Sequence, residues 1–483
     1  MEFEAVIGLE VHVQLNTATK IFCGCKNAFG ASANTQTCPV CQGHPGVLPV
    51  LNREVLSKAM TAALAINATI APETRFDRKH YFYPDLPKAY QISQFDMPLC
   101  SKGVVHITVP RDDGTQYEKD IGVTRIHMEE DAGKLVHDEH GEPVSYVDLN
   151  RAGTPLIEIV SEPELKSPEE AYQYLTELKK IMQYIDVSDC NMEEGSLRCD
   201  ANVSIRPKGD TRLGTKAEIK NMNSFRHVRM AIEHEIKRQI KAVENGEQIV
   251  QETRLYDANQ NTTRSMRSKE EAHDYRYFPC PDLSPQRITA EMIAAARAKL
   301  PELPNAKAAR MRDAYGLSGQ DIAVLIETRA LAEYYEAAVA AYPKQPKKIA
   351  NWIMVEVNAH LNDKGIPITA FTTVPPKHIG MLFKLIDDGV ISGKIAKDVF
   401  ADMITSGDEP SAVIERKGLK QVSDTGAIED AVKKVIADNA AVVAEFKAGK
   451  EKSFGFLVGQ VMKATKGQGN PKVVNDILRK MLG

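Results

Sequence analysis

The sequence predicts an α+β domain followed by two all-α domains. Through the first 290 residues, apolar and polar side chains alternate in short segments, which is the period-two pattern of strands with one buried face. After residue 290 the chain is rich in alanine, and its apolar residues recur at helical spacing. The length of 483 residues also exceeds that of one ordinary domain. We expect domains at 1–290, 291–405 and 406–483, the first built on a largely antiparallel sheet.

Strand and helix patterns are both present in the first domain. Residues 10–15 and residues 197–205 each alternate polar and apolar side chains, so each segment is predicted to be a strand with one polar face. Apolar residues at helical spacing predict helices at 168–184 and 226–245. This mixture within one stretch of chain is typical of an α+β domain.

Helices dominate the prediction beyond residue 290, and prolines separate several of them. Pro471 stands near the start of the last expected helix, where proline is well tolerated. A loose linker around residues 406–410 is expected to precede the small tail domain. The expected helical segments are 289–299, 319–341, 346–361, 454–465 and 471–482.

The composition is that of a globular protein of the cytoplasm. Apolar residues make up 43% of the chain and charged residues 26%, and no segment approaches the roughly 18 consecutive apolar residues of a membrane span. The N-terminus lacks the basic start of a signal peptide. We therefore expect a cytoplasmic protein with no membrane partner and with reduced thiols. Because the net charge is −4, any nucleic-acid surface has to be a local basic patch.

Four of the eight cysteines form two close pairs. Cys23 and Cys25 are separated by one glycine, and Cys38 and Cys41 follow after a short loop as a C-x-x-C pair. Two such pairs are able to bring four thiolates to one tetrahedral Zn²⁺, in a structural site without an open position. The alternative is four reduced cysteines without metal. A redox role for the second pair is disfavoured because no βαβ unit surrounds it.

Polar residues on the predicted strands form the second candidate site. Glu10 and His12 lie on the same face of one strand, about 6.6 Å apart along it. Glu158 interrupts an apolar strand, where an isolated carboxylate is costly to bury. Carboxylates and one imidazole on neighbouring strands suit Mg²⁺ and the phosphates of a nucleotide. The alternative is a solvated sheet face with ordinary ion pairs. Further polar residues of this pattern are Glu129, Glu130, Arg198, Asp200, Asn202, Glu218 and Lys220.

Common nucleotide and amidase motifs are missing from the sequence. There is no Gly-x-x-x-x-Gly-Lys-Ser/Thr loop and no Rossmann glycine fingerprint after a strand, so an ATP site here is of an uncommon type. No Ser/Gly-rich amidase stretch and no obvious Cys-His pair for glutamine hydrolysis is present. We expect that the chain does not make its own ammonia.

The chain resembles, nearly from end to end, the B-subunit family of the amidotransferases that act on Asp-tRNA(Asn) and Glu-tRNA(Gln). Such long and numerous matching stretches are highly specific. Residues 7–14 read IGLEVHVQ and residues 76–85 read FDRKHYFYPD, for example. The other stretches are 90–94, 125–134, 150–163, 192–202, 218–225 and 273–279.

The resemblance implies a fold and a reaction. Family members have an N-terminal cradle domain, a helical domain and a tail domain similar to the YqeY family. The cradle uses ATP to phosphorylate the side-chain carboxylate of Glu or Asp misattached to tRNA(Gln) or tRNA(Asn). Ammonia from an amidase partner, the glutaminase of the complex, then completes the amide, which makes the enzyme a ligase. A small third protein clasps the glutaminase and the B-type chain into a heterotrimer.

The resemblance also implies roles for individual residues. In the family, several positions are associated with metal binding and with the ammonia channel. The residues at these positions that are expected to be catalytic Mg²⁺ ligands are Glu10, His12, Glu130, Glu158 and Asp200, with Glu129 as a further ligand. Contact with ATP or substrate is expected from Lys79, Asn150, Ser196, Arg198, Asn202, Glu218 and Lys220. Some family members lack the four cysteines, whereas this chain has all four, which favours bound Zn²⁺.

The tail supports binding to RNA. Between residues 450 and 483 there are seven Lys or Arg residues and two Asp or Glu residues, an excess of five positive charges. Such a patch is able to follow phosphates, although an excess of this size also fits a solvated basic face. The resemblance favours contact with tRNA, which would recognise shape more than bases. The residues expected to contact tRNA are Lys463, Lys466, Lys472, Arg479 and Lys480.

Two other functions use the same features. In the first, the chain only clamps tRNA for a catalytic partner, and the acidic sheet face is incidental. In the second, the clustered carboxylates bind metal ions for a nuclease. ATP cleavage that requires misacylated tRNA separates the amidotransferase from both.

Overall fold

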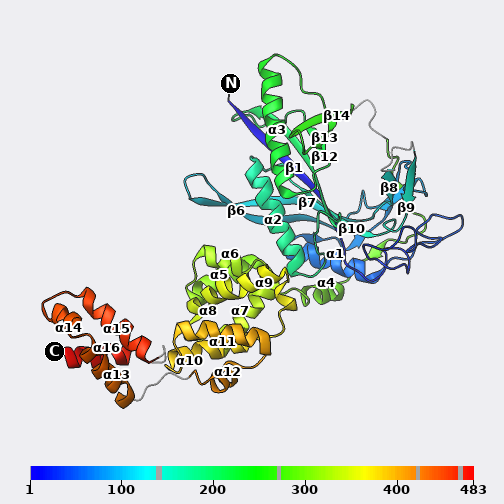
Figure 1. The fold of residues 1–483 in the computed structure, drawn as a ribbon. Coiled ribbons are helices and arrows are strands. Elements are labelled where there is room, and N and C mark those ends of the chain that lie inside the picture. Colours follow the sequence, from blue (N-terminus) through cyan, green and yellow to red (C-terminus); the bar gives the residue numbers. More distant parts are fainter. Residues whose placement is uncertain (1, 138–143, 269–273, 420–424, 466–470) are drawn as a thin grey trace. The chain divides into compact units, whose positions relative to one another are not determined.

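The computed structural model describes residues 2–137, 144–268, 274–419, 425–465 and 471–483 (Figure 1). The chain divides into two compact units, Met1–Pro304 and Asn305–Gly483. In this division the expected helical domain and tail domain fall into one unit, so the three-domain arrangement stays a prediction. The α+β character of the first part and the helical character of the rest are confirmed by the order of the elements.

A nine-stranded sheet forms the centre of the first unit. Its strands are β1 (Phe3–Gln14), β2 (Thr69–Ile70), β6 (Cys100–Pro110), β7 (Gln116–Glu130), β10 (Pro155–Ser161), β11 (Leu197–Pro207), β12 (Ala217–Lys220), β13 (Glu252–Asp257) and β14 (Thr262–Ser268). They lie in the order β14-β13-β12-β11-β1-β10-β7-β6-β2. The described pairs are antiparallel except β12 with β13, which confirms a largely antiparallel sheet.

Strand β1 shows why the sheet has one apolar and one polar face. Its side chains at Leu9, Val11 and Val13 are fully buried, whereas Glu10 and His12 between them are only partly buried. Strand β11 repeats this alternation, as predicted from the sequence. Because successive side chains of a strand point to opposite faces, the odd positions of β1 build the core and the even positions stay available for chemistry.

Helices α2 (Pro168–Tyr184) and α3 (Phe225–Glu244) lie along the sheet, where α2 contacts β6 and α3 contacts β11 (Figure 1). Both helices occur where the helical spacing predicts them. Ser167 caps α2 by accepting a hydrogen bond from the amide of Glu170, and Pro168 follows at the first helical position. Helices α1 (Arg53–Ala65) and α4 (Ala290–Arg297) contact each other in the same unit.

Smaller sheets border the central one. Strands β4 (Asp77–His80), β5 (Tyr90–Ser93) and β15 (Phe278–Pro279) form a three-stranded sheet in the order β15-β4-β5, and β5 contacts β7. Strands β8 (Lys134–His137) and β9 (Ser145–Asp148) pair with each other, as do β3 (Glu73–Thr74) and β16 (Gln286–Arg287). The three-stranded sheet therefore adjoins the strand that carries Glu129 and Glu130.

The described part of the second unit consists of helices and their connections. The segment expected as one helix at 319–341 contains α6 and α7, because Thr328 caps a new helix there. A short tail core gathers Val432, Leu457, Val461 and Leu478. The helices are α5 (Pro304–Tyr315), α6 (Gly319–Leu325), α7 (Arg329–Ala341), α8 (Pro346–Trp352), η2 (Ile353–Val357), α9 (Asn358–Lys364), η3 (Ile368–Ala370), α10 (Pro376–Asp387), α11 (Gly393–Ser406), α12 (Pro410–Lys417), α13 (Thr425–Asp438), α14 (Ala440–Lys447), α15 (Lys452–Ala464) and α16 (Pro471–Leu482).

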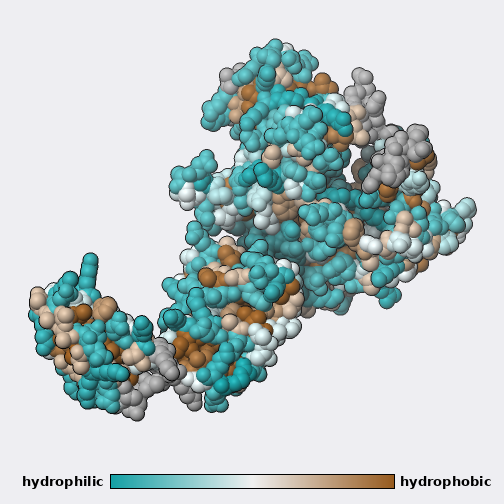
Figure 2. Space-filling view, in the orientation of Figure 1, coloured by the Kyte–Doolittle hydropathy of each residue, from teal (hydrophilic) through white to brown (hydrophobic). Residues whose placement is uncertain are grey.

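The surface agrees with the composition. On the face seen in Figure 2, hydrophilic side chains cover most of the first unit. Among the residues that the structure describes, no helix combines the length and the apolar character needed to cross a membrane.

Candidate functional site

Strand register brings polar side chains from four strands together on the polar face of the central sheet. His12 on β1 lies opposite Glu158 on β10 and opposite Arg198 on β11. Glu158 lies opposite His127 on β7. These pairings convert residues that are far apart in the sequence into one row across the sheet.

The first acidic group consists of His12, Glu129 and Glu158, whose ligand atoms lie within 4.8 Å of one another. His12 Nε2 is 3.4 Å from an oxygen of Glu158 and 3.6 Å from an oxygen of Glu129. His127 Nε2 approaches the same two carboxylates at 3.2 and 3.8 Å. His127 was not a candidate from the sequence, although its position two residues before Glu129 on one strand is a signal for it.

Charge balance dominates the electrostatics of the first acidic group. Burial by itself lowers the pKa of His127, but Glu129 and Glu158 outweigh it and raise that pKa to about 9. Burial by itself raises the pKa of Glu158, and the contacts with His12 and His127 outweigh it and hold that pKa well below its usual range. Attraction between two imidazoles and two carboxylates therefore holds this group together.

The second acidic group consists of Glu10, Asp200 and Glu218, again with ligand atoms within 4.8 Å of one another. Asn202 donates a hydrogen bond of 2.9 Å to Glu10. Lys220 contacts Asp200 and lies 3.0 Å from Glu218. Glu10 and His12, expected in one cluster, thus belong to two neighbouring groups.

Burial shapes the electrostatics of the second acidic group. It raises the pKa of Glu10, and the nearby charge of Glu158 adds to the rise. Burial lowers the pKa of Lys220 by itself, but the charges of Asp200 and Glu218 outweigh it and raise that pKa. A crowded, partly buried set of carboxylates with one lysine is suited to a cation that would replace or join that lysine.

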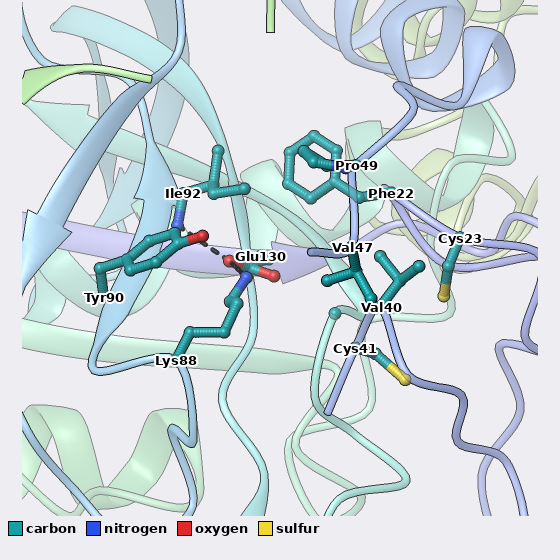
Figure 3. Close-up of a pocket in the computed structure, with 11 residues that line it drawn as sticks. Phe22, Cys23, Val40, Cys41, Val47, Pro49, Lys88, Tyr90, Ile92 and Glu130 are labelled. Carbon is teal, nitrogen blue, oxygen red and sulfur yellow. Dashed lines mark hydrogen bonds and ion pairs between the residues drawn. The ribbon is translucent and has the colours of Figure 1, made fainter. Parts of the chain in front are cut away.

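Glu130 is in neither acidic group. Its side chain is buried, accepts a 2.9 Å hydrogen bond from the amide of Ile92 and pairs with the ammonium of Lys88. The reason is strand alternation, because Glu129 and Glu130 are adjacent on β7 and point to opposite faces. A pocket of about 20 Å³ adjoins this pair, with Lys88 and Glu130 on one side and Cys23 and Cys41 on the other (Figure 3).

The four clustered cysteines lie together as their spacing predicts. Their sulfur atoms are within 4.8 Å of one another, close enough to share one ion. Lys20 is fully buried beside them, and its Nζ lies 3.6 Å from Cys41 Sγ and 2.8 Å from the carbonyl oxygen of Gln36. The pKa of the Cys41 thiol falls to about 4, first through its contact with Cys23 and also through the charge of Lys20. The donor set fits Zn²⁺.

A pocket of about 560 Å³ opens beside the second acidic group, whose Asp200 lines it, and its size suits a nucleotide-like ligand. Four expected ATP or metal residues line it: Asn150, Ser196, Arg198 and Asp200. Lys134 and Arg151 line it as well and were missed, although they lie within the matched stretches 125–134 and 150–163.

Several pocket residues also hold their surroundings in place. Arg198 donates a 2.9 Å hydrogen bond to Asp131. Asn150 accepts from the amide of Gln36 at 2.8 Å and donates to the carbonyl oxygen of Ser32 at 2.7 Å, which fixes the cysteine loop against the pocket. Ser196 accepts a 2.7 Å hydrogen bond from the amide of Asn191.

Lys79 lies among aromatic rings instead of lining the 560 Å³ pocket. Its Nζ is 4.7 Å from the ring centre of Tyr275 and 5.7 Å from that of Tyr81. Burial by itself lowers the pKa of Lys79, but the charge of Glu129 leads the effects that raise it. Lys79 therefore faces the first acidic group from the side of the three-stranded sheet.

The basic tail residues are only partly described. Lys463, Arg479 and Lys480 are exposed, and the guanidinium of Arg479 lies 5.0 Å from the ring centre of Phe454. Lys466 lies outside the described residues. Lys472 is on α16, and its side chain is outside the description.

Comparisons with known proteins cover nearly the whole chain. Residues 5–294 match the GatB/GatE catalytic domain, and residues 333–482 match the GatB domain. A protein of Brachyspira hyodysenteriae is 67% identical over 482 residues, which is 100% of both chains. A protein of Geotalea daltonii is 57% identical over 485 residues, again 100% of both chains, and one of Carboxydothermus hydrogenoformans is 55% identical over 483 residues, 100% of this chain and 99% of the relative. Each relative is named as the B subunit of an aspartyl/glutamyl-tRNA(Asn/Gln) amidotransferase.

Proposed function

The chain belongs to the GatB/GatE family, and we infer that it acts as the B subunit of a tRNA-dependent amidotransferase. The enzyme converts Glu-tRNA(Gln) to Gln-tRNA(Gln), Asp-tRNA(Asn) to Asn-tRNA(Asn), or both. We propose that this chain performs the ATP-dependent activation of the misattached side-chain carboxylate. The single observation that carries the proposal is a nucleotide-sized pocket lined by Asp200 of the second acidic group, on the polar sheet face that carries both groups.

The chemistry requires activation because a carboxylate is a poor acyl donor. A carboxylate oxygen of the substrate attacks the γ-phosphorus of ATP, the bond to the β,γ-bridging oxygen breaks, and ADP leaves. The nitrogen of ammonia then attacks the carbonyl carbon, the bond to the phosphate oxygen breaks, and the nitrogen loses a proton. The acyl phosphate between the two steps has to be shielded from water, which the partly buried sheet face favours.

Two Mg²⁺ sites fit the donor atoms. The first would use His12, Glu129 and Glu158, and the second would use Glu10, Asp200 and Glu218. When bound, Mg²⁺ neutralises phosphate charge and orients phosphate oxygens.

The pocket supplies positive charge for the remaining phosphate oxygens. Lys134, Arg151 and Arg198 line it together with Asp200, so a nucleotide there would meet three cationic side chains. We propose that ATP binds in this pocket. Asn202, Glu218 and Lys220 would then act through the second acidic group, since they contact or belong to it.

Glu130 and Lys88 have a different role in this proposal. Their buried ion pair borders a pocket of about 20 Å³, room for about one water-sized molecule such as ammonia. We place this pair on the route by which ammonia from the glutaminase (amidase) partner reaches the activated carboxylate. A small third protein completes the proposed heterotrimer.

Zinc and the basic tail support the reaction without taking part in it. The four cysteines would hold a structural Zn²⁺ that fixes the loop beside the ATP pocket. Lys463, Arg479 and Lys480 would contact tRNA phosphates.

Trapping of the acyl phosphate tests the proposal. The assembled enzyme is incubated with misacylated tRNA, ATP and hydroxylamine, without glutamine or ammonia. We expect ATP cleavage only with misacylated tRNA, and an ATP-dependent hydroxamate at the side-chain carboxyl of the attached amino acid, distinct from the α-hydroxamate that the ester to tRNA gives without ATP. ATP cleavage that is equal with uncharged tRNA, or absence of the hydroxamate, contradicts activation by this chain. Shortened tRNA products after incubation with Mg²⁺ alone would indicate a nuclease instead.

A further inference from the structure

Two pairs of aromatic rings stack on the three-stranded sheet, one pair on each of its faces. The rings of Phe95 and Tyr277 are 4.3 Å apart and inclined by only 9°, and the rings of His80 and Phe278 are 4.8 Å apart and inclined by 22°. The pair of Phe95 and Tyr277, on the face that also carries Lys79 and Ser93, is called the aromatic platform below. Its two residues come from two distant stretches of the chain, which the pairing of β4 with β15 joins.

The aromatic platform is unusual because one of its two rings is open to solvent. Phe95 is 54% exposed, and Tyr277 beneath it is partly buried. Packing in a hydrophobic core does not explain an exposed stack, because aromatic rings that stabilise a core are buried in it. Exposed parallel rings of this kind are the surfaces on which unpaired nucleic-acid bases stack.

The aromatic platform adjoins the first acidic group. Ser93, at the end of β5, donates a 3.3 Å hydrogen bond to Glu129. Lys79, next to His80 on β4, has its ammonium 4.7 Å from the ring centre of Tyr275, and the charge of Glu129 acts on it. A ligand lying on the platform therefore ends next to the first acidic group.

Charge on the platform suits a polyanion. The ammonium of Lys79 lies on the same face of the sheet, 4.7 Å from the ring centre of Tyr275. Cations held against ring faces keep their charge near bases and phosphates of a bound strand.

Two adenine-bearing ligands would fit stacked rings, namely ATP and the end of the tRNA. The pocket of about 560 Å³ lies against Arg198 and Asp200, on the side of the sheet face that carries the second acidic group. If ATP occupies that pocket, the platform remains free for the other substrate. The platform adjoins Glu129 of the first acidic group. The amino acid is attached to the unpaired 3′ end of its tRNA, so those nucleotides have to lie next to the site of activation.

We propose that the aromatic platform binds the unpaired 3′-terminal nucleotides of the misacylated tRNA by stacking, with Phe95 and Tyr277 as the principal contact. This inference rests on the proposed function for the nature of the substrate. It adds the surface that positions the aminoacyl end at the first acidic group.

Terminal base stacking is measurable by fluorescence. The assembled enzyme is titrated into tRNA(Gln) that carries 2-aminopurine in place of the 3′-terminal adenine, because stacking quenches this base. We expect quenching by the unmodified enzyme and by the Phe95→Tyr variant, and little quenching by Phe95→Leu. Tyr146→Leu, which removes a ring that is 61% exposed on the β8–β9 hairpin, is the matched control and should quench normally.

Kinetics give the second readout. Phe95→Leu should raise KM for misacylated tRNA about tenfold or more, the effect of losing one stacked base, while KM for ATP stays within twofold. Thermal unfolding of the variant checks that the small sheet remains folded, and rescue by Phe95→Tyr excludes a general defect.

The outcomes separate the possible occupants. Normal quenching and unchanged KM for tRNA in Phe95→Leu overturn the proposal. A raised KM for ATP with unchanged KM for tRNA also overturns it and assigns the platform to the adenine of ATP. If the unmodified enzyme forms no hydroxamate, the proposed function fails, and the quenching experiment still decides whether the platform binds the tRNA end.

Discussion

The ammonium of Lys20 lies 3.6 Å from Sγ of Cys41, and the lysine side chain has no exposed surface. A buried cation needs a nearby negative charge, and four thiolates around Zn²⁺ carry two net negative charges. Lys20 also donates hydrogen bonds to the carbonyl oxygens of Gln36 and Leu149. It therefore connects the cysteine cluster with the wall of the 560 Å³ pocket that we propose for ATP, where Asn150 follows Leu149.

Replacing Lys20 should weaken the hold on zinc. We expect Lys20→Met to lower Zn²⁺ affinity about 10- to 100-fold, as for other residues that contact metal ligands. The measurement is transfer of zinc to a colorimetric chelator, with Lys26→Met as the control variant. Equal rates of zinc loss in the two variants would show that Lys20 does not balance the charge of the cluster.

Removing zinc should alter ATP binding more than catalysis. Asn150 fixes the cysteine loop at the edge of the pocket, so loss of the ion should raise KM for ATP several-fold with a smaller change in kcat. The chelated enzyme is assayed before and after zinc is restored. Unchanged KM for ATP in verified zinc-free enzyme would contradict the connection.

Neutralising the first acidic group should abolish activation. We expect Glu158→Gln to lower acyl-phosphate formation by about 10²-fold or more, because it removes one proposed Mg²⁺ ligand and the partner of His12 and His127. Glu162→Gln, a carboxylate close in sequence that accepts a hydrogen bond from Thr124, is the matched control. The hydroxamate assay reports both variants, and near-normal yield with Glu158→Gln would remove this residue from the site.

Breaking the Lys88–Glu130 pair should separate activation from amidation. Glutamine-dependent amidation should fall more than tenfold in Lys88→Met/Glu130→Met, while hydroxamate formation persists. Both partners are replaced because one buried charge left alone costs about 3–5 kcal/mol, whereas an apolar pair of similar volume is often tolerated. A parallel loss of hydroxamate would place the pair in the activation site instead of on the ammonia route.

Reversing charge in the tail should weaken tRNA binding in a salt-dependent way. The triple variant Lys463→Glu/Arg479→Glu/Lys480→Glu should raise KM for misacylated tRNA and reduce the slope of affinity against salt by about one for each lost phosphate contact. The matched control reverses Lys344, Lys347 and Lys394, which are exposed on or beside other helices of the second unit. Identical salt slopes for the two variants would exclude the tail from tRNA binding.

Local patterns predicted much of the fold. The alternation at residues 10–15 predicted β1, and helical spacing predicted α2 and α3, because both patterns report which face of an element is buried. The cysteine spacing predicted the cluster for the same reason, since short loops bring C-x-C and C-x-x-C pairs together.

The pairing of neighbouring strands decided which polar side chains meet, and the sequence alone did not predict this. His127 joins the first acidic group, and Glu130 points away from both groups, because β10 lies between β1 and β7 in a particular register. A shift of register by one residue would exchange the two faces, and the sequence of a single strand does not set that register.

By itself, the sequence determined the α+β and helical composition, the polar face of β1 and the grouping of the four cysteines. Its resemblance to a family supplied the reaction. Only the tertiary structure divided the carboxylates into two groups, buried Lys20 beside Cys41 and stacked Phe95 on Tyr277. The physical reason is range: periodicity records burial within one element, whereas these contacts join residues that only long-range packing brings together.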